Sequence, residues 1–311
     1  MRQELDYIYE IYKSGSFSKA AENLYMTQPA LSMSIRKIET QIGMVLFDRK
    51  KRPLQLTEAG EIYIRAIEKM RHLEEDIQDE LNDIRTLATG TLRIGGTHYI
   101  NARILPPILT AFRNAYPGVE IQLAESSAAT LSSMLESQTV DLILNCDEPY
   151  IEKFEHYPAF QDHILLAVPA KEPLNNALKN CRLTALDIQS GRHLTNAVAP
   201  IPWSLLKDLP LINLSKNNNL HDRVLKIFQQ AGIIPHITLE ISQLVTAYHL
   251  AESGFASTFT CDRIINAPTT GLYFYKLDTP QARRSFYMLL PHREYTPKAV
   301  RRFIKFFTAH I

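Results

Sequence analysis

The most informative stretch of the chain lies near its start, where residues 17–60 read FSKAAENLYMTQPALSMSIRKIETQIGMVLFDRKKRPLQLTEAG. Ser18 is suited to cap a short helix. Thr27 is suited to cap a longer one, with Pro29 in its first turn, where a missing N–H costs nothing. Apolar residues recur at helical spacing in the longer segment and also in residues 5–12. The pattern therefore predicts three helices with a tight connection between the last two.

Three helices in this order are typical of a helix-turn-helix, in which the last helix lies in the DNA major groove. The outward side chains of the third helix include Arg36 and Lys37, and basic side chains of this kind reach phosphates and base edges. A small helical bundle with a solvated face would show the same pattern. The helices alone therefore leave both interpretations open.

A basic hairpin is predicted directly after the third helix. Gly43 ends the helix, and residues 49–52 (Arg-Lys-Lys-Arg) precede Pro53 and the alternating residues 54–56. A charge run by itself is more often a solvated loop. Beside a recognition helix, however, cations on a two-stranded wing can pair with the phosphates of the adjacent backbone. The position of the run thus favours contact with DNA.

These residues together resemble the amino-terminal signature of LysR-type transcriptional regulators. The similarity is nearly continuous over residues 17–24, 27–32, 35–39, 43, 46–49 and 56–60. It implies a winged helix-turn-helix whose third helix faces the groove, with Arg49 and Thr57 holding the DNA backbone. Met33 and Ser34 depart from the longer polar residues common in the family at their positions, which favours weaker or different base readout there. The expected DNA-binding residues are Ser18, Thr27, Gln28, Pro29, Ser32, Met33, Arg36, Lys37, Arg49, Lys50, Lys51, Arg52 and Thr57.

A long helix is predicted from its cap at Thr57 to about residue 88. Its charge is opposite to that of the first segment: residues 58–88 hold nine acidic and four basic side chains, against six and nine in residues 1–57. Apolar residues recur with an eleven-residue period, which fits a nearly straight helix. The apolar positions are Ile62, Ala66, Met70, Leu73, Ile77, Leu81, Ile84 and Ala88.

This helix would be about 45 Å long at 1.5 Å per residue, too long to bury its apolar stripe against a 57-residue head. The stripe could dock against the larger domain of the same chain or pair with a second copy. We favour pairing, because a two-fold dimer presents two reading heads to a palindromic site. The resemblance also implies a dimer, with a seam at Ile62, Ala66, Met70, Leu73, Ile77, Leu81 and Ile84.

The remainder of the chain alternates strands with helices, which predicts parallel sheets covered by helices. Residues 164–169 are expected to cross into a second lobe, and residues 255–259 and 272–277 to cross back. The resemblance implies an effector-binding half of two Rossmann-like lobes, similar to periplasmic binding proteins. The expected domains are 1–57 (winged helix-turn-helix), 58–88 (linker and dimerisation helix) and 89–311 (effector domain, with lobe I at about 91–163 and 268–311 and lobe II at about 164–267).

Ligands of open parallel sheets bind beyond the carboxyl ends of the strands, where helix N-termini donate N–H groups. The resemblance places effector-contacting hydroxyls at Thr97, Ser127 and Ser215, although each could be only a helix cap. Hydroxyls and amides at helix starts suit a small anion such as a carboxylate, to which Lys216 and His98 could add positive charge. The expected effector-binding residues are Thr97, His98, Tyr99, Ser126, Ser127, Asn213, Ser215 and Asn217.

Composition excludes several other classes of protein. Hydrophobic residues make up 45% and charged residues 22%, which rules out general disorder. No apolar run is long enough for a membrane helix, and the acidic first ten residues do not form a secretory leader. Three widely spaced cysteines argue against a disulfide framework and favour the cytoplasm.

Two further functions remain as alternatives. An enzyme fused to a DNA-binding head finds no support, because the common nucleophile, zinc, phosphate-loop and dinucleotide motifs are absent from the sequence. The histidine pairs His98/His156 and His221/His236 lack ligand-like spacing. No catalytic residue, metal or cofactor is therefore expected. A redox sensor is the second alternative, but Cys146 and Cys181 fall in different predicted lobes with nothing to activate a thiolate.

The sequence therefore predicts a cytoplasmic transcription regulator. Its expected partners are double-stranded DNA, a small-molecule effector, a second copy in a dimer or tetramer, and RNA polymerase. The long connection at Gln189–Trp203, which holds the only tryptophan, borders either the ligand cleft or an oligomer contact.

Overall fold

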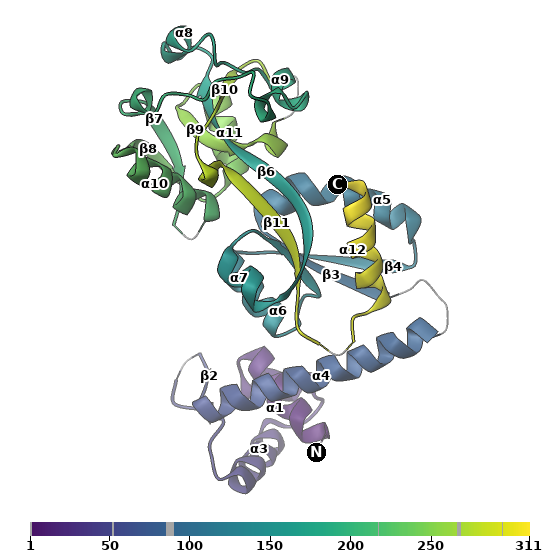
Figure 1. Cartoon of the computed structure of the whole chain (residues 1–311). Helices are drawn as coiled ribbons and strands as arrows, with labels where there is room; N and C mark the ends of the chain where they lie inside the picture. The colour runs from purple at the N-terminus through teal and green to yellow at the C-terminus, as the bar shows by residue number, and fades with distance from the viewer. Residues whose placement is uncertain (1, 52, 85–89, 217, 266–268, 294) are drawn as a thin grey trace. The chain divides into compact units, whose positions relative to one another are not determined.

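The computed structural model describes residues 2–51, 53–84, 90–216, 218–265, 269–293 and 295–311 (Figure 1). The chain divides into two units, Met1–Leu81 and Asn82–Ile311. Within the described residues, no helix combines the length and apolarity that crossing a membrane requires.

The first unit is a winged helix-turn-helix followed by a long helix. Its core is formed by apolar residues that include Ile8, Leu31, Ile35 and Phe47, and the start of the long helix packs onto that core through Ile64 and Ile67. A short antiparallel hairpin forms the wing, with residues 49–54 between its strands. The elements are α1 (Arg2–Ser14), α2 (Phe17–Asn23), α3 (Gln28–Ile42), β1 (Phe47–Asp48), β2 (Gln55–Leu56) and α4 (Glu58–Ile84).

The ends of these helices show why the segments fold as they do. Thr27 caps α3 as predicted, since its hydroxyl oxygen accepts from the N–H of Ala30 at 3.4 Å. The predicted cap at Ser18 is wrong. The helix begins at Phe17, whose ring packs edge-on against Phe47, so Ser18 lies exposed inside α2. Ser16 is the N-cap and, in the described structure, makes no side-chain capping bond.

The second unit contains one long sheet. Nine strands of its described residues pair in the order β4-β3-β5-β11-β6-β9-β7-β8, with β10 also paired to β6. The strands are β3 (Gly90–Gly96), β4 (Val119–Glu125), β5 (Leu142–Asn145), β6 (Glu155–Pro169), β7 (Pro210–Leu214), β8 (His236–Ile241), β9 (Ser257–Cys261), β10 (Leu272–Lys276) and β11 (Arg283–Leu290).

Two long antiparallel strands, β6 and β11, join the lobes of this unit and run side by side between them (Figure 1). Residues 155–163 of β6 pair with β11, whereas residues 164–169 pair with β9 and β10 in the second lobe. The prediction that residues 255–259 and 272–277 cross back is therefore wrong. Both segments pair within the second lobe, and β11 makes the return.

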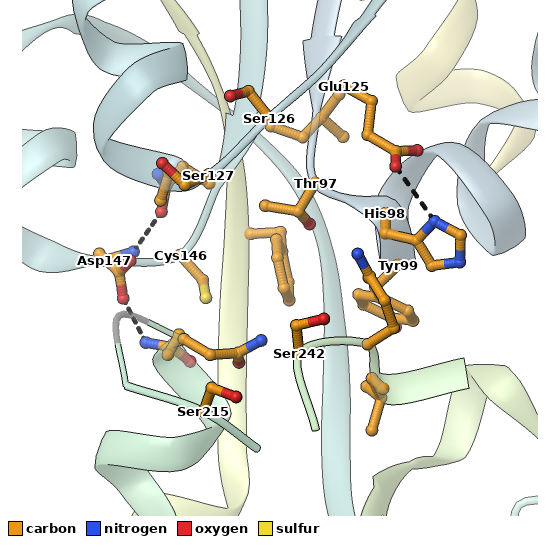
Figure 2. A pocket seen from close by; sticks show the side chains of 18 of the residues that line it. Thr97, His98, Tyr99, Glu125, Ser126, Ser127, Cys146, Asp147, Ser215 and Ser242 are labelled. Carbon is orange, nitrogen blue, oxygen red and sulfur yellow. Dashed lines mark hydrogen bonds and ion pairs between the residues drawn. The ribbon is translucent and has the colours of Figure 1, made fainter. Parts of the chain in front are cut away.

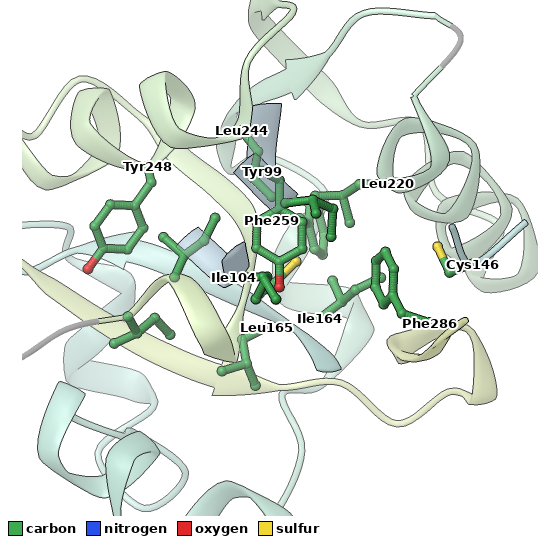
Figure 3. Close-up of a cluster of buried hydrophobic side chains, with 14 of the residues drawn as sticks. Tyr99, Ile104, Cys146, Ile164, Leu165, Leu220, Leu244, Tyr248, Phe259 and Phe286 are labelled. Atoms are coloured by element: carbon green, nitrogen blue, oxygen red, sulfur yellow. The ribbon is translucent and has the colours of Figure 1, made fainter. Parts of the chain in front are cut away.

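Helices cover both parallel parts of the sheet. The last helix closes the first lobe, with Phe303 and Phe306 packed edge-on against Phe112. Buried side chains such as Ile164, Leu165 and Phe286 continue the core along the crossing strands (Figure 3). The helices and helical turns are η1 (Ile100–Ile104), α5 (Leu105–Ala115), α6 (Ala128–Glu136), α7 (Glu148–Lys153), α8 (Leu174–Ala177), α9 (Ala185–Gln189), η2 (Arg192–Leu194), η3 (Trp203–Leu206), α10 (Asn219–Ala231), α11 (Leu244–Glu252), η4 (Asp262–Ile264), η5 (Pro280–Ala282) and α12 (Lys298–His310).

Candidate functional site

A cavity of about 450 Å³ lies between the two lobes of the second unit (Figure 2). This size is in the range of small-molecule sites, roughly 300–1,000 Å³. Segments that follow the carboxyl ends of β3, β4, β5, β7 and β8 surround it. The lining residues are Thr97, His98, Tyr99, Glu125, Ser126, Ser127, Ala128, Leu144, Asn145, Cys146, Asp147, Ser215, Lys216, Asn218, Asn219, Ser242, Gln243, Leu244, Arg284 and Phe286.

The N-termini of three helices meet at this cavity. Ser127, Asn218 and Gln243 all line it, and they are the N-cap residues of α6, α10 and α11. Ser127 accepts from the N–H of Thr130, and Asn218 accepts from that of Leu220. Among the described residues, Gln243 makes no such side-chain bond. Helix N-termini carry unpaired N–H groups and a partial positive charge.

Six of the predicted effector residues line the cavity: Thr97, His98, Tyr99, Ser126, Ser127 and Ser215. The prediction that Asn213 contacts the effector is not supported. Asn213 is buried in β7, and its Nδ2 lies 3.2 Å from His221 Nδ1. The contact with His221 of α10 holds the Asn213 side chain, which is not among the residues that line the cavity. Asn217 lies outside the described residues.

Acidic residues that the sequence reasoning missed also line the cavity. Glu125 lies with its Oε1 3.2 Å from His98 Nδ1, and Asp147 accepts a hydrogen bond from Asn219 of the facing lobe. Burial raises the pKa of Asp147 above its ordinary value, although the Asn219 hydrogen bond and nearby arginines oppose the shift. Asp147 comes two residues after the end of buried β5, so the carboxyl-end rule could have found it.

A buried ion pair lies on the crossing strands at the cavity. Arg284 of β11 faces Asp162 of β6, donating from Nε to Oδ1 at 2.8 Å and from Nη2 to Oδ2 at 2.6 Å. The hydroxyl of Tyr99 donates to the same Oδ2 at 2.8 Å. Arg284 and Tyr99 line the cavity, so this network connects its wall to the strands that join the lobes.

The cysteines are poor candidates for redox chemistry. Cys146, Cys181 and Cys261 are all buried free thiols. Burial raises the pKa of each, that of Cys146 to about 12, which keeps the thiols protonated at neutral pH. Since the thiolate is the reactive form, these observations oppose the redox-sensor alternative.

The predicted reading surface lies on α3. Its Gln28, Pro29, Met33, Arg36 and Lys37 are exposed, and Met33 is 71% exposed. A continuous accessible face on the third helix is what insertion into a major groove requires.

The wing is fixed to α3 by a buried carboxylate that the sequence reasoning missed. Glu39 accepts from the N–H of Leu46 and from Nη2 of Arg49, both at 2.9 Å. Arg49 also donates to half-buried Ser32 at 3.0 Å and lies over the ring of Phe17. Glu39 thereby links the wing to α3.

The other wing residues differ in their availability. Lys50 and Lys51 are exposed, and Arg52 lies outside the described residues. The hydroxyl of Thr57 donates to the carbonyl of Val45 and accepts from the N–H of Gly60 at 3.1 Å. Thr57 therefore holds the start of α4 against the wing.

Most of the predicted seam on α4 is exposed within the first unit. Its larger side chains are 45% to 62% exposed, and Ala66 is also exposed. The side chain of Ile84, the last residue of the predicted seam, lies outside the described side chains. The exposed larger residues are Ile62, Met70, Leu73, Ile77 and Leu81.

Comparison with known proteins identifies both parts of the chain. The profile of the LysR substrate binding domain matches residues 85–311, and that of the bacterial regulatory helix-turn-helix protein, lysR family, matches residues 3–61. An uncharacterised HTH-type transcriptional regulator of Bacillus subtilis, YcgK, is 26% identical over 291 residues, which cover 93% of this chain and 88% of YcgK. A probable RuBisCO transcriptional regulator of Cyanophora paradoxa is 33% identical over 199 residues, 61% of each chain.

Solved structures show the same fold. The structure of full-length CbnR complexed with its target DNA superposes with a TM-score of 0.66 at 19% identity and covers 99% of both chains. The match extends over the helix-turn-helix, the long helix and the two-lobed unit. The chain therefore belongs to the LysR family of transcriptional regulators, with a DNA-binding helix-turn-helix domain and an effector-binding domain.

Proposed function

We propose that this regulator binds a palindromic promoter site as a homodimer and responds to a small anionic effector, of the carboxylate class, bound in the cavity between its lobes. The convergence of three helix N-termini on that cavity carries the proposal for the effector. Oriented N–H groups bind carboxylates without a dedicated cation. The hydroxyls of Thr97, Ser127 and Ser215 supply further donors.

The charged side chains support an anion over a cation. Glu125 is already paired with His98, and Asp147 accepts from Asn219. Lys216 is exposed at the edge of the cavity. A cationic ligand would have to compete with those existing donors for the two carboxylates, whereas an anion finds helix N-termini aimed at it.

A thermal-shift screen of the full-length protein tests the effector class. The ligands are small carboxylates, each paired with its uncharged amide and with the corresponding amine. At least one carboxylate should raise the melting temperature, and its amide and amine should not. Ser127→Ala should reduce the affinity for that carboxylate about tenfold, the loss expected for one hydrogen bond to a charged group. Ser133→Ala, an exposed serine of the same helix outside the cavity, is the matched control.

The affinities are compared by calorimetry, because removal of the Ser127 cap also lowers the stability of α6. Stabilisation by amines with no response to any carboxylate would contradict the anionic effector. The two serine variants losing affinity equally would show that Ser127 does not contact the ligand.

The palindromic site follows from pairing through α4. A two-fold dimer would present two α3 helices to half-sites about one helical turn apart, roughly 34 Å. We also propose that the dimers pair into tetramers. The protein would act in the cytoplasm and contact RNA polymerase there. The structure of CbnR with its target DNA supports DNA binding by this arrangement of domains.

A further inference from the structure

Three potential metal ligands meet at the point where β6 passes from one lobe to the other. His163 is the last residue of β6 that pairs with β11, and the following Ile164 pairs with Cys261 in β9. Asp262 directly follows β9, and His193 comes from η2, in the long connection at 189–203. Of the described residues that line the cavity between the lobes, none comes from this group, so it is separate from the effector site.

The donor atoms of the group already lie at a spacing that suits an ion. Oδ2 of Asp262 is 3.1 Å from Nδ1 of His163 and 3.1 Å from Nε2 of His193, and all three atoms lie within 4.8 Å of one another. A tetrahedral ion with bonds of about 2.0–2.1 Å holds its ligand atoms about 3.3 Å apart. The two distances to Asp262 Oδ2 are therefore within a few tenths of an ångström of that spacing, and the two imidazole nitrogens lie within 4.8 Å of each other.

The second oxygen of Asp262 is held in place by the backbone. Oδ1 accepts from the N–H of His163 at 3.1 Å and from the N–H of Arg263 at 2.8 Å. These two bonds fix the carboxylate plane and leave Oδ2 directed at both imidazoles. Metal-binding carboxylates in proteins are commonly oriented by such outer hydrogen bonds.

The tautomer of the buried imidazole is also compatible with metal binding. Within the described residues, Nδ1 of buried His193 has no hydrogen-bond partner that fixes the tautomer. Its Nε2 can thus present either a proton to Asp262 or a lone pair to an ion.

Access to the group is open on one side. The side chain of His163 is 30% exposed, whereas those of Asp262 and His193 are 12% and 4% exposed. An ion can enter past His163, and solvent can take the protons that ligand imidazoles release. Water or another small molecule would complete the coordination from that side.

We propose that His163, His193 and Asp262 form a binding site for one divalent transition-metal ion of the zinc class. Two imidazoles and a carboxylate are ligands that zinc and neighbouring first-row ions accept, whereas magnesium and calcium require more oxygen ligands. The sequence predicts no metal because its three ligands come from distant segments without motif spacing. A bound ion would join β6, η2 and η4 at the crossing between the lobes and stiffen that crossing.

Cobalt(II) provides a spectroscopic probe for zinc sites. Tag-free, full-length protein is depleted of metal with a chelator and titrated with Co²⁺, and zinc is then added in competition. One Co²⁺ per chain should bind with visible d–d absorption, and zinc should abolish that absorption. His163→Gln should weaken Co²⁺ binding by roughly a hundredfold, since it removes a ligand and not only an outer partner. Zinc should raise the melting temperature of the wild-type protein but not of this variant.

His249→Gln is the matched control, because His249 and Glu252 form a pair at 3.2 Å to which no described residue adds a third ligand. This variant should bind Co²⁺ like the wild type. His163→Gln changes a partly exposed side chain, and unchanged melting of its metal-free form shows that it is folded. The proposal is overturned if the wild type binds no Co²⁺, or if His163→Gln binds it as tightly as the wild type does. In that case the three residues form only a hydrogen-bonded group.

Discussion

Asp147 is the acidic side chain whose charge bears most directly on what the cavity accepts. Burial raises its pKa, so it takes up a proton at a higher pH than an exposed aspartate does. Below the raised pKa the residue is neutral, and above it a negative charge faces the cavity. An anionic effector should therefore bind more tightly as the pH falls through that pKa, and a cationic effector less tightly.

Asp147→Asn removes this charge and keeps an acceptor for Asn219. At neutral pH the variant should bind an anionic effector more tightly, on the order of tenfold, which corresponds to about 1.4 kcal/mol. Its affinity should also lose the pH dependence expected of the wild type above the ordinary titration range of an aspartate. Calorimetric titrations at several pH values measure both effects. Glu148→Gln, an exposed neighbour outside the cavity, should behave like the wild type. If the variant kept the wild-type dependence of affinity on pH, a group other than Asp147 would control that dependence.

Individual site residues could be predicted where a local rule exists. Thr97 and Ser127 follow predicted strands at helix starts, and both line the cavity. Arg284 and Asp162 could not be predicted in this way, because their pairing joins strands 122 residues apart. Glu39 was missed for a related reason: its partners, Leu46 and Arg49, come from the wing that folds back onto α3.

Among the elements, α3 and the wing are expected to contribute to DNA binding by different physical means. Arg36 is exposed on the predicted groove face, and a side chain that reads bases affects specificity. Lys50 and Lys51 are exposed on the wing, where contact with phosphates adds affinity without sequence preference.

Arg36→Ala should weaken binding to the operator by about 1–3 kcal/mol and relax its sequence preference. The double variant Lys50→Ala, Lys51→Ala should bind all duplexes more weakly. The slope of the logarithm of its binding constant against the logarithm of the salt concentration should fall in magnitude by about 1 per lysine. Gel shifts at several salt concentrations, on operator and random DNA, separate the two effects. Lys179→Ala, an exposed lysine of the second unit, serves as the control. Equal loss on both DNAs for Arg36→Ala would place base readout elsewhere.

Regular elements were predictable to the extent that their pattern was local. The segments 164–169, 255–259 and 272–277, which the sequence predicts to cross between the lobes, fall in or close to the strands β6, β9 and β10. β11 was not predicted, since it begins with two arginines and shows no clear alternation. Its first two arginines make contacts across the sheet: Arg283 bonds Gln161 and Arg284 bonds Asp162. A polar side chain that is buried by a distant partner carries no local signal of its strand.

At the scale of the whole molecule, the sequence distinguished a DNA-binding head, a long helix and a two-lobed domain, and the family comparisons support that organisation. What periodicity could not decide is which partner covers the apolar stripe of α4. Within the first unit, one face of the helix is buried through Ile64 and Ile67. Leu73 and Ile77, in contrast, are 62% and 49% exposed. A row of large exposed apolar residues on one helix is typical of an interface.

Replacing Leu73 and Ile77 with aspartate places two like charges opposite their copies in a two-fold pair. The double variant should sediment as a 35.5 kDa monomer in analytical ultracentrifugation, whereas the wild type should sediment as a dimer or larger. Arg65→Asp, a charge change at an exposed position outside the seam, should leave the assembly intact. The monomer should keep its affinity for a carboxylate effector, because the cavity lies within one chain, but lose cooperative binding to a palindromic site. Persistence of the dimer in the double variant would move the interface away from α4 and leave its stripe to another partner.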